Sequence, residues 1–314
     1  MNGEELPVGV LGGGGFGWGL ARAAARVGRD VILWSRSEDA SDGPIRATRH
    51  LEALSKAEII FVAVPSIYVA DLSGRLGEHL DGSHLLVHVS RGLVGEELTT
   101  VSHVLRHETP CRRVGALAGP LVAEALAEGQ PGGGVIGTRF PEVADAVRRA
   151  IAGPTLRIYE TRDVTGVEVA SAMVGLLCLA VGYGQAGGIG PGTLAVVVTR
   201  GMAEAARVGQ ALGAEQATFG GLAGFGDLMA AVAGDERPET RLGRTMASGQ
   251  LREQAAREVG AHIEGVSIAR RVANYAASVG LVVPIAETIA DVLDGTLDSR
   301  GATERLMARR VRME

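Results

Sequence analysis

A glycine-rich loop near the start of the chain restricts the fold more than any other feature of the sequence. Gly12, Gly14 and Gly17 have the spacing G-x-G-x-x-G, directly after an apolar run at 7–11 and before a helical pattern at about 17–27. In such a strand–loop–helix unit the glycines allow a tight turn, a close approach of the backbone to a pyrophosphate, and close packing of the helix on the strand. The loop therefore predicts a Rossmann-type dinucleotide site, whose residues we expect to be Gly12, Gly14, Gly15, Phe16 and Gly17.

Alternation of expected strands and helices in the first half extends this unit into a complete sheet. The strands are expected at 7–11, 31–34, 59–64, 85–89, 114–117, 135–136 and 156–159. The later helices of this half are expected at 67–78, 94–106, 121–128 and 140–151. Strand–helix alternation of this kind predicts an α/β fold with a doubly wound, mostly parallel sheet.

The pattern changes to continuous helical periods after about Arg162. Helices are expected at 164–184, 193–212, 225–233, 251–259, 266–279, 284–294 and 303–312. We therefore predict two domains, a dinucleotide-binding Rossmann domain at 1–161 and an all-helical substrate-binding domain at 162–314. Because ligands often bind between domains, the cleft between the two is the expected ligand site.

Composition and charge exclude several classes of protein. The net charge of −5 argues against nucleic acid as the main partner. The longest uncharged apolar run, at 169–183, is shorter than the roughly 20 residues of a membrane span, so it predicts a buried helix. Cys111 and Cys178 are too few for a disulfide framework, and the polar start at 1–7 does not resemble a signal peptide. We expect a cytoplasmic protein without a membrane span or a metal site.

The end of the expected second strand bears on the choice of nicotinamide cofactor. An acid at this place would bind the ribose 2′-hydroxyl of NAD. Here the strand at 31–34 is followed by Arg36, whose planar guanidinium suits the 2′-phosphate of NADP. A solvated loop arginine is the alternative interpretation of Arg36. The prediction is therefore NADP or NAD, with NADP favoured.

Several short motifs together resemble the NAD(P)-dependent glycerol-3-phosphate dehydrogenases. The likeness lies in the order and spacing of the motifs over nearly the whole chain. They are the glycine loop at 8–17, Val64-Pro65-Ser66, Ser90-Arg91-Gly92-Leu93, Ala118-Gly119-Pro120 with Ala123 and Glu124, Thr199-Arg200-Gly201, Gly226-Asp227-Leu228 and Glu264-Gly265. The resemblance implies hydride exchange between NAD(P)H and dihydroxyacetone phosphate, which gives sn-glycerol 3-phosphate.

The resemblance also implies roles for individual residues. It places Asp227 and Arg91 in the catalytic site, and it adds Ala123 and Glu264 to the cofactor-binding residues. The residues that it assigns to the substrate are Arg91, Gly119, Leu121 and Arg237. An N-terminal helix cap is the alternative role for Asp227.

The expected active site departs from the family pattern in its basic residues. Lys56 is the only lysine, and it lies far upstream of the two positions where the resemblance implies one. Those two positions hold Val174 and Arg91, and Gly175 replaces the asparagine that should follow the first. The expected Arg-Asn pair is also missing from the stretch Arg237-Pro238-Glu239. These losses predict weak or absent oxidation of glycerol 3-phosphate by a protein that still binds the cofactor.

Three hypotheses for the function remain open at this point. The first is an altered dehydrogenase of the glycerol-3-phosphate type, acting on a small molecule such as a phosphorylated triose. The second is a dehydrogenase of the same fold with another small carbonyl or hydroxyl substrate, and the third is a non-catalytic dinucleotide-binding protein. His88 is interpreted as a sheet histidine satisfied by hydrogen bonds, with proton donation as the alternative. A homodimer is one assembly that the sequence leaves open.

Overall fold

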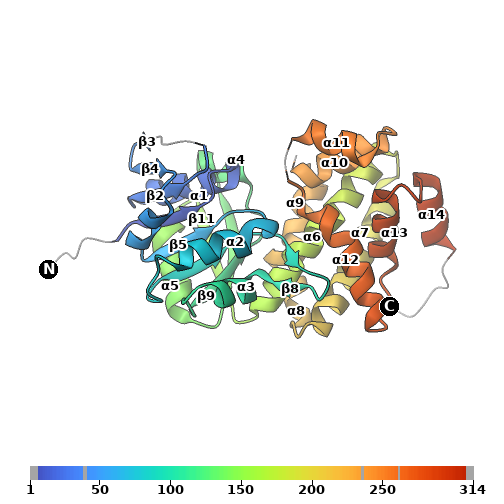
Figure 1. The fold of residues 1–314 in the computed structure, drawn as a ribbon. Helices are drawn as coiled ribbons and strands as arrows, with labels where there is room; N and C mark the ends of the chain where they lie inside the picture. The colour runs from blue at the N-terminus through green and yellow to red at the C-terminus, as the bar shows by residue number, and fades with distance from the viewer. Residues whose placement is uncertain (1–5, 38–40, 235–236, 261, 309–314) are drawn as a thin grey trace.

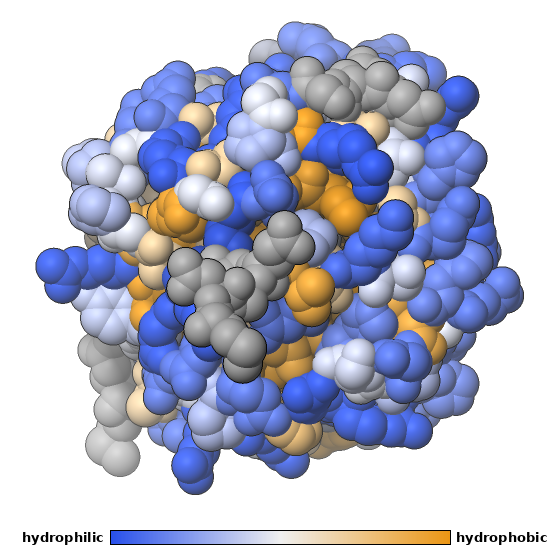
Figure 2. Space-filling model, turned by 90° about the vertical axis from the view of Figure 1, so that its left-hand side faces the viewer, coloured by the Kyte–Doolittle hydropathy of each residue, from blue (hydrophilic) through white to orange (hydrophobic). Residues whose placement is uncertain are grey.

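The computed structural model describes residues 6–37, 41–234, 237–260 and 262–308, and it contains a sheet region and a helical region side by side (Figure 1). The first half of the chain forms the sheet region (blue to green) and the second half forms the helices (yellow to red). Figure 2 shows the sheet end of the molecule, where hydrophilic side chains predominate and hydrophobic ones lie scattered among them. The arrangement confirms the predicted fold class.

Nine strands of the described residues form one sheet in the order β11-β10-β9-β6-β5-β1-β2-β4-β3. Neighbouring strands are parallel except for the pairs β9–β10 and β3–β4. All residues of the central strands β1, β2, β5 and β6 are buried, as expected of a parallel sheet that is covered on both faces. The strands are β1 (Val8–Leu11), β2 (Val31–Trp34), β3 (Ser41–Asp42), β4 (Ile45–Thr48), β5 (Ile59–Val62), β6 (Leu85–His88), β9 (Val114–Ala118), β10 (Gly132–Thr138) and β11 (Leu156–Thr161).

Helices cover both faces of this sheet because successive strand side chains point to opposite sides. Val10 and Phe61 belong to a hydrophobic cluster that includes residues of α1 and α5. Their neighbours Leu11 and Ile60 belong to a second cluster, with residues of α2 and α3. The helical segments of this region are α1 (Gly15–Arg26), η1 (Leu51–Lys56), α2 (Ser66–Gly77), α3 (Val101–Glu108), α4 (Ala123–Glu128) and α5 (Pro141–Ile151).

The helical region is built around α6 (Val164–Ala186). This helix is long and apolar enough to cross a membrane, but 89 % of its most apolar window is buried inside the protein. The prediction of a buried helix at 169–183 is therefore confirmed. The segments around it are α7 (Pro191–Ala211), α8 (Gln216–Phe219), η2 (Leu222–Gly226), α9 (Asp227–Val232), α10 (Pro238–Ala247), α11 (Arg252–Val259), α12 (Glu264–Ser278), α13 (Pro284–Leu293) and α14 (Ser299–Met307).

The helix expected at 94–106 is wrong in its first half. A hairpin of β7 (Leu93–Val94) and β8 (Thr99–Thr100) occupies this place, and α3 begins only at Val101. Gly95 and Leu98 have φ angles of 70° and 54°, and this left-handed backbone cannot continue a right-handed helix. The sequence analysis also missed β3, β4, α8 and α10.

The change from sheet to helices lies where the sequence pattern changes. β11 ends at Thr161 and α6 begins at Val164. The hydrophobic cluster around α6 also includes Ala116 and Val135 of the sheet region, so the division into domains at 161/162 remains a prediction. The last expected helix, at 303–312, begins earlier as α14, and its residues 309–312 lie outside the described residues.

Candidate active site

Four of the predicted site segments leave the carboxyl ends of neighbouring sheet strands. The glycine loop follows β1, Ser66 follows β5, Arg91 follows β6 and Gly119 follows β9. β2 and β5 lie on opposite sides of β1, so the β1–β5 pair is a topological switch point of the sheet. Open α/β sheets bind ligands outside the carboxyl ends of their strands at such a point.

The glycine loop has the geometry that the sequence predicts. Gly12 has a φ of 127°, which favours glycine, and a Cβ on Gly17 would overlap the Gly12 carbonyl oxygen. Gly14 differs from both, because a Cβ at this position would meet no protein atom within 4 Å. The protein itself therefore leaves an open space in front of Gly14.

This open space fits the phosphates of a dinucleotide. Gly14 is the N-cap of α1 and makes no side-chain cap hydrogen bond, and a helix N-terminus without such a cap can accept an anion. Gly14 and Gly15 are exposed, and a Cβ on Gly15 would lie 4.0 Å from the Cβ of Ala123. The structure thus brings Ala123 next to the loop, as expected of two cofactor-binding segments.

Arg36 lies beside the switch point but binds no acid there in the described residues. It is exposed, and its guanidinium carbon lies 5.6 Å from the ring centre of Tyr68 on α2. A cation–π contact of this kind holds the guanidinium near the end of β2. The contact leaves the guanidinium nitrogens open to a phosphate, and the predicted preference for NADP remains a prediction. Glu38, the acid nearest to this strand end, lies outside the described residues.

Glu264, at the start of α12, joins the helical region to the sheet region. Its carboxylate accepts hydrogen bonds from the Ser66 backbone nitrogen at 2.5 Å and the Ser66 hydroxyl at 2.6 Å. Burial raises its pKa, but the interactions with His262 and Ser66 outweigh burial, and the pKa lies below its usual value. A Cβ on Gly92 would overlap the Ser66 hydroxyl, so this close approach requires glycine. The role of Glu264 in cofactor binding remains a prediction, and its carboxylate would have to bind Ser66 and the cofactor at the same time.

Asp227, at the start of α9, is fully buried between two arginines. Arg91 binds it with both terminal nitrogens, Nη1 to Oδ2 and Nη2 to Oδ1, and Arg237 Nη1 donates to Oδ1 at 3.1 Å. The alternative role of Asp227 as a helix cap is wrong, since Gly226 is the N-cap of α9 and no side chain caps it. The structure therefore brings together three residues that the sequence assigned to the site separately.

Glu239 is a fourth charged residue of this cluster, and the sequence analysis gave it no role. It lies in the first turn of α10 and is 6 % exposed. Burial raises the pKa of its carboxyl, and the positive charge of Arg91 offsets part of this rise. Cys178 of α6 lies beside the cluster, 3.9 Å from Arg237 Nη1, and burial raises its pKa to about 12. The thiol is therefore neutral, and the interpretation of Cys178 as core packing agrees with its burial.

The side-chain positions of Gly119 and Leu121 face packed protein and not an open site. Gly119 has a φ of 120°, and a Cβ there would lie 3.2 Å from Gly134 Cα. Leu121 is buried in the hydrophobic cluster of the sheet region. Only their main-chain atoms could therefore contact a substrate, and their roles in substrate binding remain predictions.

His88 belongs to a separate buried group. Its Nε2 lies 2.9 Å from Oε1 of Glu168 on α6, and Glu168 accepts hydrogen bonds from the Ser102 nitrogen and hydroxyl at 2.8 and 2.6 Å. Neither ring nitrogen makes a hydrogen bond of good geometry within the described residues. The interpretation of His88 as a buried sheet histidine agrees with its burial, and its full hydrogen bonding remains a prediction.

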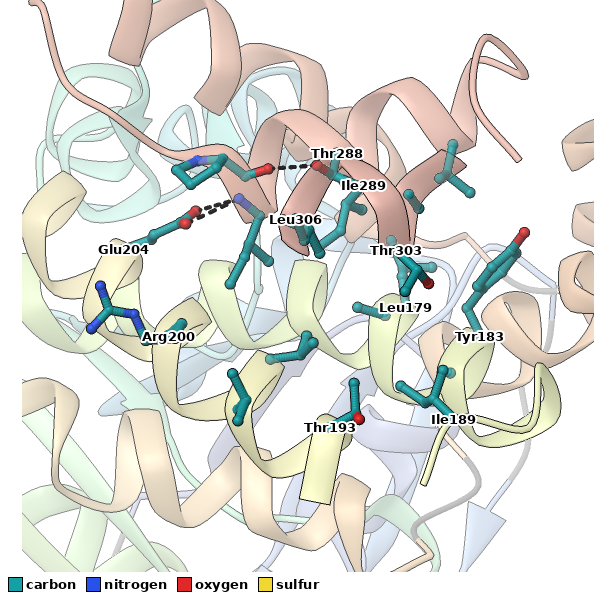
Figure 3. Close-up of a pocket in the computed structure, with 18 of the residues that line it drawn as sticks. Leu179, Tyr183, Ile189, Thr193, Arg200, Glu204, Thr288, Ile289, Thr303 and Leu306 are labelled. Atoms are coloured by element: carbon teal, nitrogen blue, oxygen red, sulfur yellow. Dashed lines mark hydrogen bonds between the residues drawn. The ribbon is translucent and has the colours of Figure 1, made fainter. Parts of the chain in front are cut away.

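A large cavity lies away from the strand ends, within the helical region (Figure 3). It has a volume of about 1450 Å³ and is lined mainly by apolar residues of α6, α7, α13 and α14. Glu204 of α7 points to the start of α13, where its carboxylate accepts from the backbone nitrogen of Ile285 (Figure 3). It also accepts from the backbone nitrogen of Ala286. Burial raises the pKa of Glu204 to about 7. This cavity lies within one region, so it is not the ligand cleft that we expect between the two regions. That cleft remains a prediction.

Comparison with protein families gives two matches that together cover most of the chain. Residues 42–144 match the model described as NAD-dependent glycerol-3-phosphate dehydrogenase N-terminus, and residues 163–304 match the model of the corresponding C-terminus. A glycerol-3-phosphate dehydrogenase [NAD(P)+] of Dechloromonas aromatica is 36 % identical, over 97 % of this chain and 98 % of that protein. A protein of the same description from Salinibacter ruber is 32 % identical, over 97 % and 96 %.

Solved structures show the same fold. The crystal structure of a glycerol-3-phosphate dehydrogenase from Coxiella burnetii matches 97 % of this chain and 99 % of its own, with a TM-score of 0.91 and 24 % identity. The yeast glycerol-3-phosphate dehydrogenase structure matches 96 % and 99 %, with a TM-score of 0.83 and 19 % identity. The arrangement of sheet and helices is therefore shared over nearly the full length of these chains.

Proposed function

The chain belongs to the NAD(P)-dependent glycerol-3-phosphate dehydrogenase family, and from this premise we propose that it exchanges hydride between NAD(P) and a small phosphorylated alcohol or ketone. Members of this family are oxidoreductases that act on a CH–OH group with NAD or NADP. sn-Glycerol 3-phosphate and dihydroxyacetone phosphate are the first substrates to test, because the relatives are named for the former and the latter is its oxidised form.

One observation carries this proposal. Arg91 from the sheet region and Arg237 from the helical region converge on Asp227, and Arg91 follows β6, which lies next to β5 of the switch-point pair. Two guanidinium groups at this place supply the planar, charged donors that bind a phosphate or a developing alkoxide. The bound cofactor would supply the hydride acceptor, with its pyrophosphate at the N-terminus of α1.

The residues that replace the lysines limit the proposed reaction. Val174 is fully buried in α6 and has no polar atom, and the guanidinium of Arg91 does not release a proton near neutral pH. Loss of one electrostatic donor typically costs about 2.7–4 kcal/mol of barrier, or about 10²–10³ in rate. We therefore expect turnover of glycerol 3-phosphate below the ordinary range of roughly 1–10³ per second.

A dehydrogenase assay tests the proposal directly. The purified chain is mixed with sn-glycerol 3-phosphate and NAD⁺ or NADP⁺, and with dihydroxyacetone phosphate and the reduced cofactors, while nicotinamide absorbance is followed. Slow turnover that disappears in Arg91→Ala and Arg237→Ala would support it. Tight cofactor binding without turnover on these or on a panel of small hydroxy and carbonyl compounds would instead favour the non-catalytic alternative.

A different small substrate is the second candidate function. Asp227 already engages both arginines, so a substrate phosphate would compete with a buried carboxylate for them. A substrate without phosphate would face no such competition, and a higher kcat/KM on such a compound would favour this candidate. The cytoplasmic location and the homodimer stay part of the proposal, and light scattering of the purified protein tests the dimer.

A further inference from the structure

The acid Glu239 lies in the proposed active site without an assigned role. We propose that Glu239 accepts the proton of the substrate hydroxyl during oxidation and returns it during reduction. This inference rests on the proposed function, since it names the residue that carries the proton in that reaction. Four observations support it: the lack of another acceptor among the described residues of the cluster, the position of Glu239, its neighbours and the direction of its pKa shift.

The other members of the cluster do not suit this task. Arg91 and Arg237 stay protonated at any pH where the protein is folded, so neither accepts a proton. Both oxygens of Asp227 already accept hydrogen bonds from these two guanidinium groups. The pKa of the Cys178 thiol, raised to about 12 by burial, leaves no thiolate near neutral pH.

His88, the other residue considered for proton transfer, lies in a different environment. Its imidazole is directed at Glu168 of α6, and that carboxylate also binds the start of α3 through Ser102. The Arg91 side chain, three residues further along the chain, is directed at Asp227. His88 and Arg91 therefore belong to two separate polar groups, and Glu239 shares the group of Arg91 with Asp227.

The position of Glu239 depends on α10 and on a missing side chain in α6. α10 begins at Pro238, which places Glu239 in its first turn. Glu239 Oε1 lies 3.8 Å from the place that a Cβ on Gly175 would occupy. The glycine therefore leaves room for the carboxyl group between the two helices.

The charged groups that act on Glu239 come from three segments. Arg91 follows β6, Asp227 begins α9, and Arg237 precedes α10, and all three affect the Glu239 carboxyl. α11 also packs on α10, and its buried residues are the apolar Ala255 and Val259. The charges of Arg91 and Arg237 thus favour the ionised form of this buried acid, and the charge of Asp227 disfavours it.

Burial raises the pKa of the Glu239 carboxyl, and the positive charge of Arg91 lowers it in part. The cofactor takes up the two electrons that the substrate loses in this step. The hydride leaves the substrate carbon for the nicotinamide of NAD(P)⁺, and the hydroxyl proton passes to the Glu239 carboxylate as the C=O bond forms. Glu239 then releases the proton to solvent before the next turnover.

Glu239→Gln tests the inference, because it keeps the size of the side chain and removes the acid. Glu258→Gln is the matched control, on an exposed glutamate of α11. Each variant is assayed for kcat and KM across pH in the oxidation direction, for cofactor affinity by fluorescence, and for unfolding in urea. We expect a fall in kcat of about 10²–10⁴-fold in Glu239→Gln, the usual contribution of a general base. Cofactor affinity should not change, and the control should match the native protein.

The pH profile separates a catalytic role from a structural one. In the native protein kcat should rise with pH through an apparent pKa above the ordinary 4.5 of glutamate, and this limb should vanish in Glu239→Gln and persist in Glu239→Asp. A Glu239→Gln protein with native kcat and a native pH limb overturns the inference and leaves the proposed function intact. A native protein without turnover overturns the proposed function, and the inference with it. If Glu239→Gln does not fold, a native profile without the limb still refutes the role of Glu239.

Discussion

Gly14 and Gly17 stand three residues apart in one loop, yet the structure predicts opposite results when each receives a side chain. Gly14 has φ −76° and ψ 174°, an extended backbone that any residue adopts, and a Cβ there meets no protein atom. Gly14→Val should therefore fold normally and lose the cofactor. Gly17→Ala should instead damage the fold, because its Cβ would overlap the Gly12 carbonyl oxygen.

The expected magnitudes follow from these surroundings. An exposed valine at Gly14 removes some unfolded-state entropy and slightly weakens the helix N-terminus, so stability should change by less than about 1 kcal/mol. The side chain would occupy the space of the pyrophosphate, and the loss of one charged hydrogen bond alone costs about 1.5–3 kcal/mol of binding. Relief of the overlap at Gly17 requires a backbone shift, which typically costs about 1–3 kcal/mol of stability.

Two measurements on the same proteins decide the matter. Urea unfolding gives the stability of each variant, and titration of NADPH fluorescence gives its dissociation constant. The reasoning is refuted if Gly14→Val binds NADPH as tightly as the native protein, or if it loses as much stability as Gly17→Ala.

Three further predictions concern single side chains. Arg36→Ala should weaken NADPH binding by about 1.5–3 kcal/mol and leave NADH binding unchanged, and equal losses for both cofactors in the titration would contradict a 2′-phosphate contact. Asp227→Asn should lower the free energy of unfolding by about 3–5 kcal/mol, because it removes the buried negative charge that Arg91 and Arg237 both bind; an unchanged urea midpoint would be at odds with this. The pKa of Glu204 is raised from 4.5 to about 7 in the folded protein, so the folded state binds this proton more tightly than the unfolded state does. The tighter binding stabilises the folded protein fully below pH 4.5, and the stabilisation is lost as the pH rises to 7. The native protein should lose about 3 kcal/mol relative to Glu204→Gln over this interval, and parallel pH curves of the two proteins would show that the Glu204 pKa is not raised.

The parts of the fold that follow from local pattern could be predicted from the sequence. Runs such as Ile59–Val62 are apolar throughout because parallel strands are buried on both faces, and the glycine loop requires special backbone at Gly12. The edge pair at 41–48 was missed because β4 alternates buried and exposed residues over only four positions. The hairpin at 93–100 was missed because the left-handed conformation of Leu98 has no sequence signal.

The site was harder to predict because its residues meet through tertiary structure. Asp227 binds Arg91, which lies 136 residues away, and no local pattern distinguishes such a pair from a helix cap. Glu239 carries less signal still, since an acid in the first turn of a helix is an ordinary feature. Only the packing of α10 on α6 shows that this acid is buried beside two arginines.

The central position of α6 has a consequence for synthesis of the chain. Val164–Ala186 leaves the ribosome before α7 to α14 exist to cover it, because all of these segments follow it in sequence. During that interval the chain exposes a helix that is long and apolar enough to cross a membrane. Nascent chains that end soon after α6 should therefore recruit chaperones or aggregate. Synthesis of the later helices buries α6 and should remove this tendency.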